Sequence, residues 1–133
     1  MSQENVENVR VLCEAFVAGH VDRALRGLDE RVVWHGTIGG LEEGEVSRGH
    51  QEVIDAFRES LQAWESHTLE AQRFIDAGDS VVVFWHEQGR GRSSGAEVTT
   101  DTAVVYTLRG DRVVEIQPYM SRNAALKAVG LAE

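Results

Sequence analysis

The second half of this chain is dominated by four segments rich in valine, threonine and aromatic residues, and this pattern constrains the fold more than any other. Residues of these types favour β-strands. The segments are separated by short turns that contain glycine, which predicts antiparallel strands joined as consecutive hairpins. The predicted strands cover residues 69–77, 80–92, 96–109 and 112–119. A sheet of this kind needs a second layer that covers at least one of its faces.

Amphipathic helices supply that second layer. Apolar residues recur at three- and four-residue steps in the first half of the chain, and Gly19 is a typical helix stop. The predicted helices cover residues 3–18, 21–28, 50–64 and 122–129. Helices first and hairpin-linked strands after is the α+β layout, with the helices packed on one face of the sheet.

The connection between the second and third helices is predicted as one short strand and one loop. Residues 31–35 favour the strand, and the glycine- and glutamate-rich residues 36–49 favour a mobile loop. At 133 residues the chain has the size of one hydrophobic core, so a single domain over residues 1–133 is expected.

Two of the predicted strands have apolar residues at both parities, over residues 81–85 and 102–108. Both faces of the sheet are therefore expected to be covered. The helices and a pocket account for one face, and a second copy of the chain is the economical cover for the other, which predicts a homodimer through the sheet. The alternative is a sheet that curls far enough to shield itself.

Charge and cysteine content narrow the class of protein. The formal net charge of -9 argues against a nucleic-acid partner. No apolar run reaches the roughly 20 residues that span a bilayer, and the N-terminus lacks a signal-peptide pattern, so a cytoplasmic protein without a membrane partner is expected. Cys13 has no disulfide partner and lies at helical spacing from Val9 and Phe16, as a core residue does.

Several motifs along the chain resemble the SnoaL-like branch of the nuclear-transport-factor-2-like superfamily. The motifs are Val-Val-Trp-His at 32–35, Arg-Gly-His at 48–50, Phe57 and Trp64 on the third predicted helix, Phe-Ile-Asp-Ala-Gly-Asp at 74–79, Gly-Arg-Gly-Arg-Ser-Ser-Gly at 89–95, Thr-Leu-Arg at 107–109 and Ala-Leu-Lys-Ala-Val-Gly-Leu at 125–131. The resemblance covers nearly the whole chain.

This resemblance implies a cone, in which a strongly curved sheet wraps around the helices and encloses one apolar pocket with its mouth near the long loop. Members are commonly homodimers and need no cofactor. Their activities include ketosteroid isomerisation, polyketide cyclisation, epoxide hydrolysis and dehydration, and some members only bind ligands. The fold therefore does not decide the function.

The resemblance also points to His35 as a catalytic residue. Isomerases of this superfamily place a carboxylate base at the end of the first strand, where this chain has His35, and an imidazole can abstract a proton near neutral pH. The alternative is a hydrogen-bonded polar residue at the edge of the cavity. The tyrosine and aspartic acid that stabilise an enolate in those isomerases are replaced by the Val11-Leu12 stretch and by Val104, so ketosteroid isomerisation is disfavoured.

Other side chains are candidates for the pocket wall. If Phe84 faces the cavity, strand parity places His86 and Arg90 on the same wall, although Arg90 at a hairpin end is also typical of a solvated residue. Tyr119 either supplies a phenol or caps the cavity. The predicted substrate-binding residues are Trp34, Phe57, Trp64, Phe84, Arg90 and Val104.

The leading functional hypothesis is a cofactor-independent acid/base enzyme of isomerase, cyclase, dehydratase or epoxide-hydrolase type that acts on a small apolar substrate. His35 is the predicted base or acid, assisted by His86, Arg90 or Tyr119. The five histidines show no metal-binding spacing, so no metal site is predicted. The alternatives are a non-catalytic small-ligand-binding protein and a dimerisation module that docks another protein.

Overall fold

The four long strands of the second half form the hairpin meander that the turns predict. In the computed structural model, which describes residues 2–131, they are β3 (Trp64–Ala77), β4 (Ser80–Gly91), β5 (Glu97–Arg109) and β6 (Arg112–Tyr119). Each is antiparallel to the next. Gly78 and Gly110 adopt φ angles of 80° and 65° in the two shortest turns, where residues with a Cβ are disfavoured.

Two further strands extend the sheet beyond β6. β1 (Leu28–His35) pairs with β6 in parallel, and β2 (Val46–Arg48) pairs with β1 antiparallel, so the order is β2-β1-β6-β5-β4-β3. The sheet is therefore mixed and not wholly antiparallel as predicted. Hairpin turns specify only neighbours in sequence, whereas β1 and β6 are brought together from opposite ends of the chain.

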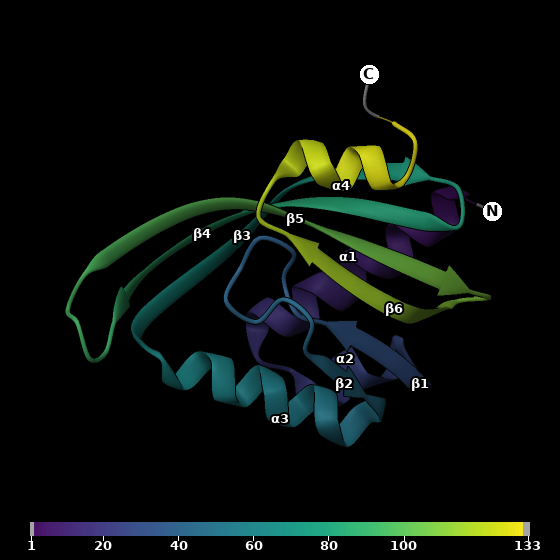
Figure 1. Cartoon of the computed structure of the whole chain (residues 1–133). Helices are drawn as coiled ribbons and strands as arrows, with labels where there is room; N and C mark the ends of the chain where they lie inside the picture. The colour runs from purple at the N-terminus through teal and green to yellow at the C-terminus, as the bar shows by residue number, and fades with distance from the viewer. Residues whose placement is uncertain (1, 132–133) are drawn as a thin grey trace.

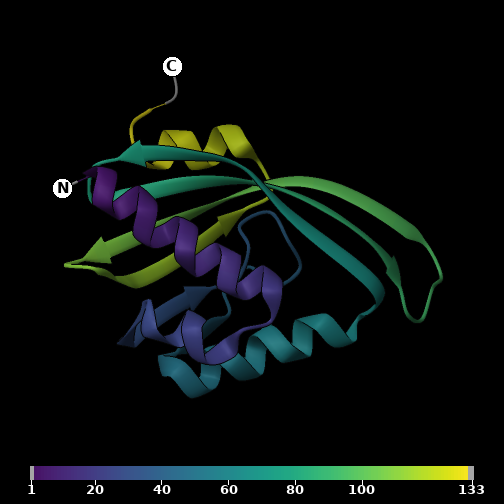
Figure 2. The same cartoon turned by 180° about the vertical axis from the view of Figure 1, so that it is seen from behind.

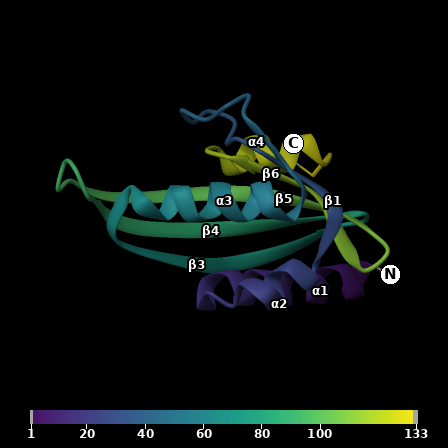
Figure 3. The same ribbon diagram turned by 90° about the horizontal axis from the view of Figure 1, so that it is seen from below.

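The helices confirm the predicted α+β layout. They are α1 (Ser2–Ala18), α2 (Val21–Arg26), α3 (Gly49–Gln62) and α4 (Arg122–Ala128). α1 packs against β3 and β4, and α3 packs against β1, β2 and β3, on what we call the inner face of the sheet (Figures 1 and 2). Figure 3 shows α1 and α2 running beside β3, with α3 in front of the middle strands and running in nearly the same direction in this view. None of these helices is long and apolar enough to cross a membrane.

The opposite, outer face is partly covered by the chain itself. α4 packs against β4, β5 and β6 on this side, and Figure 1 shows it on the other side of the sheet from α3. Its Ala125 is fully buried in a small cluster with Val82, Ala103 and Val105, separate from the main core. This corrects the expectation that the helices pack on one face of the sheet, because the apolar spacing predicts the last helix but not the face that it covers.

Arg122 attaches α4 to the sheet. Its guanidinium donates hydrogen bonds to the backbone oxygens of Thr102 and Trp85, at 3.2 and 3.0 Å, and to the side chain of Gln72 at 2.8 Å. The same group lies 4.7 Å from the ring centroid of Phe84, a cation–π contact. One side chain thus joins three strands to the first turn of the helix.

Two boundaries differ from the prediction in ways that affect the site. β3 begins at Trp64 and not at residue 69, so Trp64 is a strand residue and α3 ends at Gln62. β2 lies within the predicted loop 36–49 and anchors its second half to β1. The shift at β3 places five additional residues on the sheet, among them His67.

Candidate functional site

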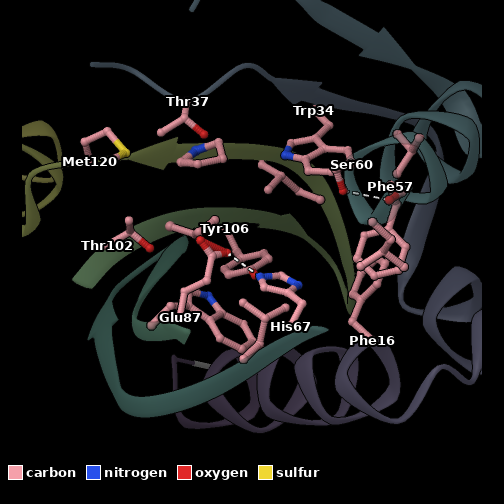
Figure 4. A pocket seen from close by; sticks show the side chains of 17 residues that line it. Phe16, Trp34, Thr37, Phe57, Ser60, His67, Glu87, Thr102, Tyr106 and Met120 are labelled. Atoms are coloured by element: carbon pink, nitrogen blue, oxygen red, sulfur yellow. Dashed lines mark hydrogen bonds and ion pairs between the residues drawn. The ribbon is translucent and has the colours of Figure 1, made fainter. Parts of the chain in front are cut away.

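A cavity of about 230 Å³ lies between the inner face of the sheet and helices α1 and α3 (Figure 4). An apolar protein cavity of about 150 Å³ admits benzene, and typical small-molecule sites measure roughly 300–1,000 Å³, so this space suits a small ligand. The lining residues are Phe16, Trp34, Thr37, Val53, Phe57, Ser60, Leu61, His67, Leu69, Trp85, Glu87, Thr102, Val104, Tyr106, Ile116, Pro118 and Met120.

Three of the predicted substrate-binding residues line this cavity. Trp34 reaches it from β1, Phe57 from α3 and Val104 from β5. Phe57 also contacts Phe16 of α1, with ring centroids 5.1 Å apart and planes at 58°. The wall is therefore built by aromatic and aliphatic side chains from both layers.

The predicted catalytic residues His35 and Tyr119 lie outside the cavity lining. His35 follows Trp34 with opposite parity, and its Nε2 lies 2.8 Å from a carboxylate oxygen of Glu115. Tyr119 packs against the cluster beneath α4, while its neighbours Pro118 and Met120 line the cavity. Partial burial, followed by the negative charge of Glu115, raises the pKa of the Tyr119 phenol.

The prediction that Phe84, His86 and Arg90 line the cavity is wrong, because all three lie outside the cavity lining. Phe84 packs in the outer-face cluster, and Arg90 pairs with Glu97 at 2.8 Å near the hairpin end. His86 Nδ1 lies 2.6 Å from Asp101, whose pKa is lowered by this hydrogen bond and then by Arg122. The β4 residues of opposite parity, Trp85 and Glu87, face the cavity instead.

The polar centre of the cavity is a histidine–glutamate pair that the sequence did not reveal. His67 of β3 and Glu87 of β4 are diagonal neighbours across the two strands, with His67 Nε2 3.1 Å from Glu87 Oε2. Their side chains are 12% and 31% exposed. The Nε2 atom is buried and has no aligned hydrogen-bond acceptor, so the contact is an ion-pair distance without hydrogen-bond geometry.

Trp64 supports His67 from behind rather than lining the cavity. The two rings stack with centroids 4.7 Å apart and planes within 5°. An irregularity in the β3–β4 register between Trp64 and Ser66 shifts the strand parity, which brings Trp64 to the same side as His67. The indole occupies the space above Gly89, where an added Cβ would lie 2.5 Å from the Trp64 ring.

Tyr106 supplies a second polar group to the cavity wall. Its hydroxyl accepts a hydrogen bond from the Cys13 thiol at 3.6 Å. Burial, followed by the neighbouring Cys13, raises the pKa of Tyr106 well above its ordinary value, so the phenol stays neutral. Burial likewise raises the pKa of Cys13 to about 12, which keeps it an unreactive thiol, as a core cysteine is expected to be.

One comparison decides the family. The chain matches the SnoaL-like domain over residues 9–116, which is most of its length. The chain belongs to the SnoaL-like domain family. The resemblance inferred from the sequence motifs is thereby confirmed.

Solved structures show the same fold for this SnoaL-like domain. TerC, co-crystallised with polyporic acid, is 22% identical with a TM-score of 0.76, over 95% of this chain and 98% of that one. A nuclear-transport-factor-2-like protein of unknown function from Burkholderia pseudomallei is 24% identical with a TM-score of 0.77, over 96% and 98% of the two chains. A Catenulispora acidiphila protein with a ketosteroid isomerase-like fold, in complex with trimethylamine, is 16% identical with a TM-score of 0.72, over 94% and 93%. Comparison with curated proteins finds no match.

One signal in the sequence of this SnoaL-like domain identifies half of the missed pair. A hairpin centred on Ser93-Ser94 pairs Val104 with Val83, so Val104 in the cavity places Glu87, and not His86, on the cavity side. No comparable signal identifies His67, because the alternation that defines β3 is interrupted by its register shifts.

Proposed function

We propose that this SnoaL-like domain binds a small, largely apolar ligand in the cavity and exchanges a proton with it through His67 and Glu87, without a cofactor. The observation that carries the proposal is the pair itself, held 3.1 Å apart in an otherwise mostly apolar wall. An imidazole beside a carboxylate is a frequent general acid/base arrangement, and a cavity that excludes water strengthens its effect.

This proposal keeps the predicted acid/base chemistry but assigns it to residues other than those predicted. His35 and His86 each contact a carboxylate outside the cavity lining, whereas His67 contacts its carboxylate within that lining. A general base must reach the proton that it abstracts. Tyr106, with a neutral phenol in the wall, is the candidate hydrogen-bond donor to a developing oxyanion.

Filling the cavity tests whether it is the ligand site. Val104→Trp is expected to weaken binding of any active compound in a panel of small aromatic ketones, enones and epoxides by about tenfold or more, because the indole occupies the ligand space. The measurement is calorimetric titration, with thermal unfolding as a check on folding. Val98→Trp is the matched control, since Val98 lies on the same strand but outside the lining and is 40% exposed. Equal binding by both variants would place the ligand elsewhere.

A non-catalytic binding protein is the second candidate. It is favoured by the size of the apolar wall relative to its few polar groups, and by the small molecules named with two similar structures, polyporic acid and trimethylamine. Binding without turnover of any compound in the panel would favour it over an enzyme.

We also propose a homodimer through the part of the outer face that α4 leaves open. This strip carries both signs of charge, in the pairs His86–Asp101 and Arg90–Glu97, so two copies related by a twofold axis can place opposite charges against each other. Light scattering is expected to give a mass near twice that of the chain. Thr99→Glu, which adds a like charge beside Asp101, is expected to shift the protein toward the monomer. A wild-type monomer at micromolar concentration would refute the proposal.

A further inference from the structure

We propose that the cavity selects a cationic ligand, a protonated amine on a small apolar body. This inference rests on the proposed function, since it takes the cavity as the ligand site and names the chemical class that it would hold. It follows from three properties of the lining: the sign of its charges, its aromatic rings and the unsatisfied polar atom His67 Nε2.

The charges of the lining favour a cation. In the part of the chain that the structure describes, the cavity is lined by one carboxylate, that of Glu87, and by neither lysine nor arginine. The basic group of this lining is the His67 imidazole, which is charged only when it is protonated. An anionic ligand would meet Glu87 without a permanent countercharge, and the formal net charge of -9 adds to that repulsion at a distance.

The aromatic rings of the lining also favour a positively charged ligand. Phe16, Trp34, Phe57, Trp85 and Tyr106 all line the cavity. The face of an aromatic ring carries negative potential and attracts ammonium groups, and tryptophan does so most strongly. Figure 4 shows Trp34 across the cavity from Glu87 and His67, as expected for strands near opposite ends of the sheet.

The His67–Glu87 contact leaves hydrogen-bonding capacity for an amine. The buried Nε2 of His67 has no aligned partner, and the Glu87 carboxylate is part-exposed. A protonated amine donates an N–H to either group, whereas a neutral hydrocarbon leaves both as they are. Binding of the cation therefore satisfies His67 Nε2, which the free protein leaves unpaired, or adds a charged partner to Glu87.

Three probes with the same heavy-atom skeleton test the charge preference directly: N,N-dimethylbenzylamine in its protonated form, isobutylbenzene and phenylacetate. Dissociation constants are measured by titration calorimetry or tryptophan fluorescence at neutral pH and low salt. The wild-type protein is expected to bind the cation about tenfold or more tightly than isobutylbenzene, and phenylacetate most weakly. Raising the salt concentration is expected to weaken binding of the cation and to leave binding of isobutylbenzene unchanged.

Glu87→Gln supplies the second arm of the test. This variant is expected to lose about tenfold in affinity for the cation while its affinity for isobutylbenzene stays within about twofold. Glu115→Gln is the matched control, because Glu115 also contacts a histidine but lies outside the cavity lining, and it is expected to behave as the wild type.

The outcomes separate this inference from the proposed function. Binding of isobutylbenzene as tight as that of the cation, or a cation preference that persists in Glu87→Gln, would overturn the cationic ligand and leave an apolar binding cavity in place. Failure of all three probes to bind would also overturn the cationic ligand, and the proposed function would then be decided by the panel of ketones, enones and epoxides with Val104→Trp. If Glu87→Gln does not fold, the salt dependence measured on the wild type decides the question.

Discussion

Replacing His67 with glutamine is expected to lower kcat/KM by about 10²–10⁴-fold for any substrate that the wild type turns over, because a positioned general acid or base typically contributes that much. Glutamine keeps hydrogen-bonding groups of similar reach but cannot exchange a proton. The measurement is steady-state kinetics on the panel of enones, epoxides and ketones, followed as a function of pH. Glu87→Gln is expected to reduce the rate in the same direction through loss of the partner carboxylate.

The control for this experiment lies on the other side of the sheet. His86 contacts Asp101 at 2.6 Å, so His86→Gln removes the same type of pair outside the cavity lining and is expected to leave kcat/KM nearly unchanged. His35→Gln, at the position that the family resemblance indicates, is expected to do the same. Loss of activity in either variant, together with full activity in His67→Gln, would show that His86 or His35 carries the acid/base chemistry in place of His67.

The fold was predictable because it depends on signals that are local in sequence. Turns that contain glycine mark the three hairpins of the meander, and apolar spacing marks the helices. The pairing of β1 with β6 was not predictable in this way, since it depends on the packing of segments about eighty residues apart. The position of α4 on the outer face was not predictable either, because a short helix with a few apolar residues fits either side of a sheet.

The site was harder to predict because it depends on which side of each strand faces inward. On β4 both parities are apolar, with Val81, Val83 and Trp85 on one face and Val82 and Phe84 on the other. Composition alone does not distinguish the two faces, and a wrong parity exchanges His86 for Glu87.

The third strand adds a second difficulty. Register shifts within β3 break the regular alternation, so no single parity describes the strand from Trp64 to Ala77. Trp64 was expected on a helix and at the cavity wall, and its aromatic ring instead stacks behind the ring of His67. Trp64 thus belongs to the site, but it lies behind His67 and not on the cavity wall.

Gly89 tests whether that stacking matters for function. Gly89→Ala is expected to lower kcat/KM by up to about 100-fold, because a displacement of about 1 Å in a catalytic group has that effect. The added Cβ would lie 2.5 Å from Trp64 Cε3 and 2.8 Å from the Ser66 backbone oxygen, so the indole must leave its place. Crowding of this kind is also expected to cost about 1–3 kcal/mol of stability. Kinetics and thermal unfolding measure the two effects separately.

Gly91→Ala is the matched control, on the same strand and two residues further along. Its added Cβ would meet the Ser94 hydroxyl at 2.8 Å, and a hydroxyl at the end of a side chain can rotate away, whereas the indole over Gly89 is held beside the Ser66 backbone. Adding Trp64→Leu to Gly89→Ala removes the clash with the indole without restoring the stack, while the close contact with the Ser66 backbone oxygen remains. If Trp64 positions His67, this double variant recovers part of the stability but no kcat/KM; recovery of kcat/KM as well would mean that the ring of Trp64 only fills space.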